Sequence, residues 1–141
     1  MFEPMKPILA FLTLVALLGC LPTEGEGGRA SIRGHIEVER RATLYNPESV
    51  VDQTPAMDEN VFIIYGENVG PDDQVETNHE GDFVFPWLRP GHYTIYVYSA
   101  DTAQPANPNV PLPDVAVVRE VDILSTKEEV VLDTLLIFDK L

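Results

Sequence analysis

Acidic side chains crowd the middle of the sequence and supply the oxygen ligands that hard cations such as Ca²⁺ prefer. Asp72, Asp73 and Asp82 are the residues best suited to bind a cation, with Glu76 and Glu80 between them. Their spacing matches no recognised calcium-binding loop, and such crowding is expected in a chain with a formal net charge of −14. We therefore expect no metal site and no other cofactor, and we expect these carboxylates to face water.

Residue types used in catalysis are present, but their spacing does not indicate an active site. Hydrolases and transferases need a nucleophile beside a base, a pair of carboxylates in a cleft, or a metal cluster. The histidines His35, His79 and His92 are isolated from one another in the sequence. None of the serines lies in the glycine-flanked turn of a nucleophile elbow. The sequence therefore predicts that the protein is not an enzyme, unless the fold brings distant acids and histidines together.

Three aromatic residues are candidates for ligand binding. Trp87, Tyr96 and Tyr98 could stack against the flat apolar faces of sugars, and Tyr96 and Tyr98 share one face of a predicted strand. In the alternative interpretation the two tyrosines pack as ordinary cross-strand pairs and Trp87 covers the core. The sequence leaves both interpretations open.

The single cysteine, Cys20, directly follows Leu17-Leu18-Gly19 at the end of an apolar run that begins at Ile8. A secretory signal peptide has an apolar centre of roughly 7–15 residues and a small residue before its cleavage site. The run is shorter than the roughly 20 apolar residues that cross a bilayer. The pattern resembles the lipobox of bacterial lipoproteins, in which cleavage precedes the cysteine and the thiol then carries diacylglycerol.

This resemblance implies a signal peptide over residues 1–19 and a lipid on Cys20. It places the protein in the bacterial cell envelope, attached to the membrane by its N-terminal lipid and facing the periplasm or the cell exterior. Two or three acyl chains anchor a protein firmly where one does not. Met5 is a second possible start, and it would put Lys6 directly before the apolar run. The alternatives are an ordinary signal peptide with an incidental cysteine, or a soluble protein whose first helix is apolar.

The charge and the cysteine count exclude some classes of partner and of fold. A net charge of −14 argues against nucleic acid and anionic lipid surfaces as partners, because both require clustered lysine and arginine. With one cysteine there is no intramolecular disulfide. The fold must therefore depend on an apolar core, for which about 120 residues after cleavage are sufficient.

Alternating apolar residues predict β-strands and no long helix. In the first strand Ile32, Gly34, Ile36 and Val38 alternate with polar residues and so share one face. The other expected strands span residues 61–65, 74–78 at an edge, 82–85, 93–99, 115–123 and 130–138, with the last two forming a hairpin. About seven strands predict an all-β fold, a two-layer antiparallel β-sandwich.

Three segments fall outside these strands. Residues 20–30 are expected to form the lipidated cysteine and a flexible tether, followed by one domain over residues 31–141. Residues 41–60 and 101–114 are long and carry no clear pattern, and such loops are often where function lies. The alternative for residues 41–60 is that their apolar side chains only cover an open sheet edge.

The residues from Gly81 to Tyr93 follow the pattern Gly-x-Phe-x-Phe-x-x-Leu-x-Pro-Gly-x-Tyr. Together with the runs 32–36 and 61–65, this motif resembles the carboxypeptidase regulatory-like family of transthyretin-type β-sandwiches, over about residues 30–138. The resemblance implies a transthyretin-like (prealbumin-like) Greek key with Phe83, Phe85 and Tyr93 in the core. It specifies a fold far better than a function.

These observations together predict a non-catalytic lipoprotein of the cell envelope that acts as a binding or structural module. Its expected partner is another envelope protein or an extracellular ligand, contacted through the loops. A carbohydrate-binding module that holds a polysaccharide through exposed aromatic residues is the alternative. Nucleic acid is not an expected partner.

Overall fold

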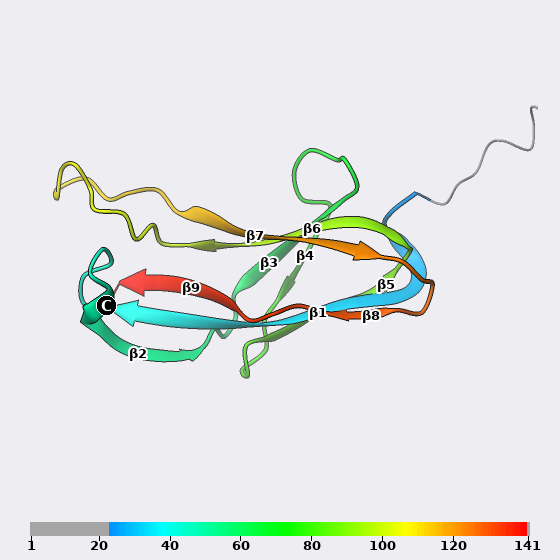
Figure 1. Cartoon of the computed structure of the whole chain (residues 1–141), viewed down its shortest axis with the longest axis horizontal. Coiled ribbons are helices and arrows are strands. Elements are labelled where there is room, and N and C mark those ends of the chain that lie inside the picture. The colour runs from blue at the N-terminus through cyan, green and yellow to red at the C-terminus, as the bar shows by residue number, and fades with distance from the viewer. Residues whose placement is uncertain (1–22, 141) are drawn as a thin grey trace, which may run out of the picture.

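Residues 23–140, which this computed structural model describes, form two β-sheets that lie face to face (Figure 1). A 3₁₀ turn, η1 (Pro47–Ser49), is the one short helical element among them. No helix in this part of the chain is long and apolar enough to cross a membrane. The strands are β1 (Glu26–Arg41), β2 (Val50–Pro55), β3 (Asn60–Tyr65), β4 (Asp73–Glu76), β5 (Asp82–Leu88), β6 (Gly91–Ser99), β7 (Val115–Ile123), β8 (Glu129–Val131) and β9 (Leu135–Lys140).

The first sheet is organised around β1. One edge of β1 pairs with antiparallel β5 and then with antiparallel β2, and the other edge pairs with parallel β8 and then with parallel β9. Neighbours on both edges hold β1 along most of its 16 residues. At about 3.3 Å per residue such a strand is at most about 50 Å long, and β1 runs from one end of the sandwich to the other (Figure 1).

The second sheet has the order β4-β3-β6-β7, and all its pairs are antiparallel. β4 corresponds to the polar edge strand that the sequence predicts over residues 74–78, and it does lie at an edge. β7 forms the opposite edge. The central strands β3 and β6 carry most of the aromatic side chains of this sheet.

The core lies between the sheets and follows the alternation of the sequence. On β1, Ile32 and Ile36 are fully buried, and Gly34 lies between them on the same face. A Cβ atom on Gly34 would lie 2.6 Å from the Phe83 ring, so only glycine fits there without a shift of that ring. The other large apolar residues of the core are Val38, Val61, Ile63, Phe83, Phe85, Leu88, Tyr93, Ile95, Val97, Val121, Ile123, Leu135 and Ile137.

The predicted all-β, two-layer sandwich is confirmed, but three details of the prediction are wrong. The described chain has nine strands, not about seven, because β2 forms within residues 41–60 and the run 130–138 is divided into β8 and β9. The predicted final hairpin does not form, since β7 belongs to the second sheet and β8 and β9 to the first. The sandwich is also not wholly antiparallel, because β8 and β9 run parallel to β1.

The flexible tether predicted over residues 20–30 does not extend to residue 30. β1 begins at Glu26, and Ala30 is fully buried. Just before the strand, the Gly25 carbonyl accepts a hydrogen bond from the Arg89 amide at 2.9 Å, and the Gly25 amide donates to the Tyr93 hydroxyl at 2.9 Å. These contacts attach the start of β1 to the connection between β5 and β6.

The two ends of the sandwich differ. At one end, here called the N-terminal end, lie the start of β1, the β5–β6 connection and the β7–β8 turn (Figure 1). At the other, here called the loop end, lie the β1–β2 segment and the long β6–β7 segment. The two segments that the sequence left unassigned therefore meet at one end of the molecule.

Candidate functional site

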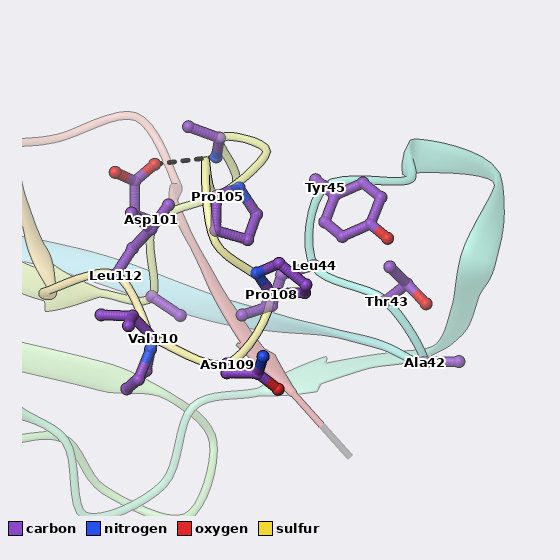
Figure 2. Close-up of a pocket in the computed structure, with 13 residues that line it drawn as sticks. Ala42, Thr43, Leu44, Tyr45, Asp101, Pro105, Pro108, Asn109, Val110 and Leu112 are labelled. Atoms are coloured by element: carbon purple, nitrogen blue, oxygen red, sulfur yellow. Dashed lines mark hydrogen bonds between the residues drawn. The ribbon is translucent and has the colours of Figure 1, made fainter.

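The loop end contains an open pocket with a volume of about 520 Å³ between the two long segments (Figure 2). One wall is the stretch that follows β1, and the other is the proline-rich stretch between β6 and β7. Most of the lining residues are apolar, and polar groups come from the side chains of Thr43, Tyr45, Asp101 and Asn109. The lining residues are Ala42, Thr43, Leu44, Tyr45, Ala100, Asp101, Ala103, Pro105, Pro108, Asn109, Val110, Pro111 and Leu112.

Arg41 positions the first wall. Its Nε donates to Glu39 Oε1 at 2.6 Å, and its Nη1 donates to the Leu44 carbonyl at 3.0 Å. Its guanidinium also lies 4.4 Å from the centre of the Phe138 ring. The Arg41 and Glu39 side chains are 11% and 12% exposed, so the ion pair is shielded and stronger than a surface pair. These contacts fix the chain as it leaves β1.

Ser49 closes the rest of that wall into a compact loop. Its hydroxyl donates to the Thr43 carbonyl at 2.8 Å and accepts from the Thr43 amide at 3.1 Å. The Asn46 side chain accepts from the Glu48 amide at 3.0 Å and so caps η1.

The second wall is attached to β9, the strand that carries Phe138 and so also contacts the first wall through Arg41. The Ala100 amide donates to the Phe138 carbonyl at 3.0 Å, and the Phe138 amide donates to the Ser99 hydroxyl at 2.9 Å. Within the wall, Asp101 Oδ1 accepts from the Ala103 amide at 2.8 Å, as the dashed line in Figure 2 shows. Because both walls are attached at Phe138, the pocket is built into the fold.

The predicted residues Tyr96 and Tyr98 lie on the outer face of the second sheet, where Phe62 joins them. The Phe62 and Tyr96 rings are stacked with centroids 5.1 Å apart, and the Tyr98 ring stands at 82° to that of Tyr96 at 5.7 Å. Tyr98 is 47% exposed. Loss of hydration by burial raises the pKa of Tyr96, which is consistent with a closely packed aromatic cluster. The two tyrosines thus pack across the sheet and also present one exposed ring.

A groove of about 350 Å³ runs beside Tyr98 and is lined by polar groups. Arg40, Glu59 and Asp114 contribute charged side chains to its wall. Burial, followed by repulsion from Asp139 and Asp114, raises the pKa of Glu59. An exposed ring beside hydrogen-bonding groups can hold a ligand with both apolar and hydroxyl faces.

Trp87 does not join the two tyrosines. It is the second-last residue of β5 in the first sheet, directly before the connection to β6, whereas Tyr98 is near the far end of β6. Among the described residues, the ring contacts of Tyr96 and Tyr98 are to each other and to Phe62. Trp87 is 67% exposed, so the alternative in which it covers the core is also wrong.

The three aspartates considered for calcium binding have other hydrogen-bond partners, which are local for Asp72 and Asp73, whereas the partner of Asp82 is His35. Asp72 accepts from the Tyr65 amide and the Asn68 side chain, and Asp73 accepts from the Gln74 amide. Asp82 lies on the other sheet.

Each histidine pairs with its own carboxylate and not with another histidine. His35 Nδ1 lies 2.8 Å from Asp82 Oδ1, and His92 Nδ1 lies 2.8 Å from Asp122 Oδ1. His79 Nε2 lies 4.0 Å from Glu80 Oε1. Across residues 23–140 there is no group of three or more histidine, cysteine, aspartate or glutamate side chains that could hold a metal ion. Cys20 and the predicted signal peptide lie outside the described residues.

Sequence reasoning placed functional interest in the two loops but missed the residues that bring them together. Nothing in the sequence pairs Arg41 with Phe138, which are far apart in the chain. Phe62 was assigned to a strand without a role. Its alternation with Val61 and Ile63 places it on the outer face, which is the signal that could have identified it.

No protein-family model matches the chain, and a search of curated proteins finds no relative. Among solved structures, it is similar to a candidate carbohydrate-binding protein from Pseudomonas aeruginosa, with a TM-score of 0.45 and 12% identity over 82% of this chain and 91% of that one. It is also similar to (S)-allantoin synthase, with a TM-score of 0.40 and 14% identity. That match covers 96% of this chain, which spans about half (52%) of the synthase. Neither similarity is close enough to assign a family or a ligand.

Proposed function

We propose that the protein is a lipid-anchored, non-catalytic binding module of the bacterial cell envelope. The observation that carries this proposal is the pocket at the loop end, where two segments distant in sequence meet on a common anchor at Phe138. Open, mostly apolar pockets with a few polar groups are typical of binding sites. The lipobox-like sequence ending at Cys20 supports the anchor, and the motif from Gly81 to Tyr93 supports membership in the carboxypeptidase regulatory-like family.

The position of the pocket suits a module attached by its N-terminus. Residue 23 is at the N-terminal end, and the pocket is at the loop end, separated by the length of β1 (Figure 1). A lipid on Cys20 would hold the N-terminal end near the membrane and turn the pocket toward the periplasm or the exterior. An envelope protein could then reach the pocket without approaching the bilayer.

The test is affinity capture from native envelopes with three forms of the full chain as bait. The double variant Tyr45→Ala/Val110→Ala removes two exposed side chains of the pocket, whereas Val69→Ala removes an exposed side chain from a different loop. We expect the wild type and Val69→Ala to retain a partner that the double variant loses. Capture of the same proteins by all three baits, or of none together with no ligand that shifts the Tm, would contradict the proposal.

Carbohydrate binding is the second candidate function, and the exposed ring of Tyr98 beside a polar groove favours it. Affinity electrophoresis against a panel of polysaccharides tests it directly. We expect a retarding polysaccharide to bind Tyr98→Ala about tenfold more weakly, because one stacking ring is lost. Tyr45→Ala, which changes the loop pocket instead, should migrate like the wild type. Unchanged migration in every gel would reject this function.

A further inference from the structure

Trp87 is held in a backbone conformation that tryptophan rarely adopts. Its φ is +60°, in the left-handed region that favours glycine and asparagine. Its side chain is 67% exposed, so core packing does not compensate for the strain. Strained residues of this kind gather at functional positions. Trp87 is also the only tryptophan of the chain.

The neighbours of Trp87 fix it in this conformation. The side chain of Leu88, the next residue, is 1% exposed and packs in the core. The Arg89 amide donates to the Gly25 carbonyl at 2.9 Å, and the Arg89 carbonyl accepts from the buried Tyr93 hydroxyl at 2.7 Å. The normal alternation of β5 is broken, and Pro86 and Trp87 are exposed in succession.

Leu124 adds a second exposed apolar side chain to the N-terminal end. It is 83% exposed and directly follows Ile123, which pairs with Gly91 at the start of β6. The Glu128 carboxylate accepts from the Leu124 amide at 2.7 Å and so fixes the backbone of the β7–β8 turn. That turn and the β5–β6 connection share one end of the sandwich (Figure 1).

The described chain starts beside these residues. Arg89 Nη1 donates to the Thr23 carbonyl at 3.4 Å. Cys20 precedes Thr23 by three residues, and a fully extended chain covers about 11 Å over that distance. A lipid on Cys20 would therefore bring Trp87 and Leu124 close to the surface of the bilayer.

We propose that Trp87 and Leu124 form a membrane-docking surface that enters the interfacial layer of the bilayer to which Cys20 is anchored. This inference rests on the lipid attachment in the proposed function. Tryptophan is enriched at membrane–water interfaces because its ring is apolar and its N–H is polar. Weak insertion is sufficient, since the lipid anchor makes the contact intramolecular and raises its effective concentration.

The charges at this end indicate docking on lipid without a requirement for anionic headgroups. Arg29, Arg89 and Lys127 are accompanied in the same segments by Glu24, Glu26 and Glu128. The surface is therefore not a basic patch of the kind that binds anionic lipids. Docking should therefore need no anionic lipid, and because the chain is acidic, anionic lipid should not strengthen it.

The fluorescence of the single tryptophan tests the proposal. The full chain, expressed in a bacterial host and purified from membranes, is placed in phosphatidylcholine vesicles that contain lipids brominated near the headgroup. We expect about twofold quenching of Trp87 fluorescence, as for an interfacial ring. The matched control, Trp87→Phe/Tyr45→Trp, carries its only tryptophan at the loop end and should not be quenched. Quenching should persist at high salt, and added phosphatidylglycerol should not increase it.

Failure of the anchor and failure of the docking surface are distinguishable. If mass spectrometry finds no acyl chain on Cys20, the proposed anchor fails and the docking surface fails with it. If the chain is acylated and Trp87 is not quenched, or both tryptophan positions are quenched equally, only the docking surface is overturned. A soluble polysaccharide that shifts Trp87 emission in the absence of vesicles would identify a glycan contact instead and also overturn it. Trp87→Asn should keep the wild-type Tm, and a lower Tm would show a structural role.

Discussion

At the scale of single residues, the Tyr93 hydroxyl links two parts of the chain that are distant in sequence. Tyr93 is fully buried, yet its hydroxyl accepts from the Gly25 amide and donates to the Arg89 carbonyl. A buried polar group without a partner is costly, so this tyrosine is required both for its ring and for its oxygen. The last residue of the motif at residues 81–93 therefore attaches the start of β1 to the β5–β6 connection, in addition to the turn that the motif forms.

Replacing Tyr93 with phenylalanine should lower the free energy of unfolding by about 1–3 kcal/mol. The ring and its packing remain, but the amide of Gly25 loses its partner. Chemical denaturation measures the loss. Tyr45→Phe is the control, because Tyr45 is 48% exposed and its change should stay within about 0.5 kcal/mol. Equal stability of Tyr93→Phe and the wild type would show that the hydroxyl bridge does not contribute.

The hydrogen bond to Asp122 raises the pKa of His92 above its usual value near 6.5. Proton binding to His92 therefore favours the folded state, and this contribution is present below pH 6.5 and is lost as the pH rises through the folded-state pKa. Asp122→Asn should lower the His92 pKa and remove the contribution of His92 protonation to the free energy of unfolding below pH 6.5. Above the folded-state pKa, where His92 is neutral, its titration should contribute nothing in either protein. An NMR titration of the His92 imidazole protons in the wild type and in Asp122→Asn measures this change in pKa. An unchanged His92 titration in Asp122→Asn would disprove the assignment.

At the scale of elements, the sequence predicts which residues face inward far better than which strands are neighbours. The alternation of Ile32, Gly34, Ile36 and Val38 depends only on the pleat of the strand, and the structure confirms it. The same kind of alternation does not show which strands pair. Residues 115–123 and 130–138 are predicted to form a hairpin because a short turn between two strands usually does so, and this prediction is wrong. Here the turn crosses between the sheets, and β9 pairs with β1, which is distant in the sequence.

The pocket also depends on neighbours that the sequence does not predict. Their length and lack of a clear pattern indicate residues 41–60 and 101–114 as candidate functional loops. That the two loops meet could not be predicted, since the contact between Arg41 and Phe138 exists only after β9 has paired with β1. Trp87 gives the opposite case, because its residue type suggested a ligand site with Tyr96 and Tyr98, and the crossover between sheets separates it from them.

Gly28 allows β1 and β5 to approach closely at an irregular point in their register. A Cβ atom added there would lie 1.8 Å from the Leu88 carbonyl oxygen and 2.6 Å from the Arg89 amide nitrogen, both of them backbone atoms. We expect Gly28→Ala to lower the free energy of unfolding by about 2 kcal/mol or more, as steric strain in a packed region does. Arg29→Ala, at the exposed next position, is the control and should change little. Thermal unfolding followed by circular dichroism compares them, and a Tm of Gly28→Ala equal to that of Arg29→Ala would contradict the close approach.

At the scale of the whole molecule, β1 fixes the distance between the two ends. Its neighbours on both edges prevent it from bending independently, and a strand of its length places the loop end at most about 50 Å from its start. The attachment of Gly25 to Tyr93 and Arg89 leaves few residues between Cys20 and the folded domain. If Cys20 carries a lipid, as proposed above, this short connection would restrict the orientation of the domain more than a long flexible tether would.

This geometry predicts a measurable height of the pocket above the membrane. An Ala42→Cys variant carries one reactive thiol, because Cys20 is blocked by lipid in the proposed mature form, and a fluorescent donor can be attached there. Energy transfer to an acceptor at the vesicle surface should be weak, consistent with a separation of about 50 Å. A donor on Ser125→Cys, in the β7–β8 turn, should transfer efficiently, because that turn lies at the N-terminal end. Equal transfer from the two positions would mean that the domain lies flat or tumbles on its anchor, and the loop pocket would then not be presented away from the bilayer.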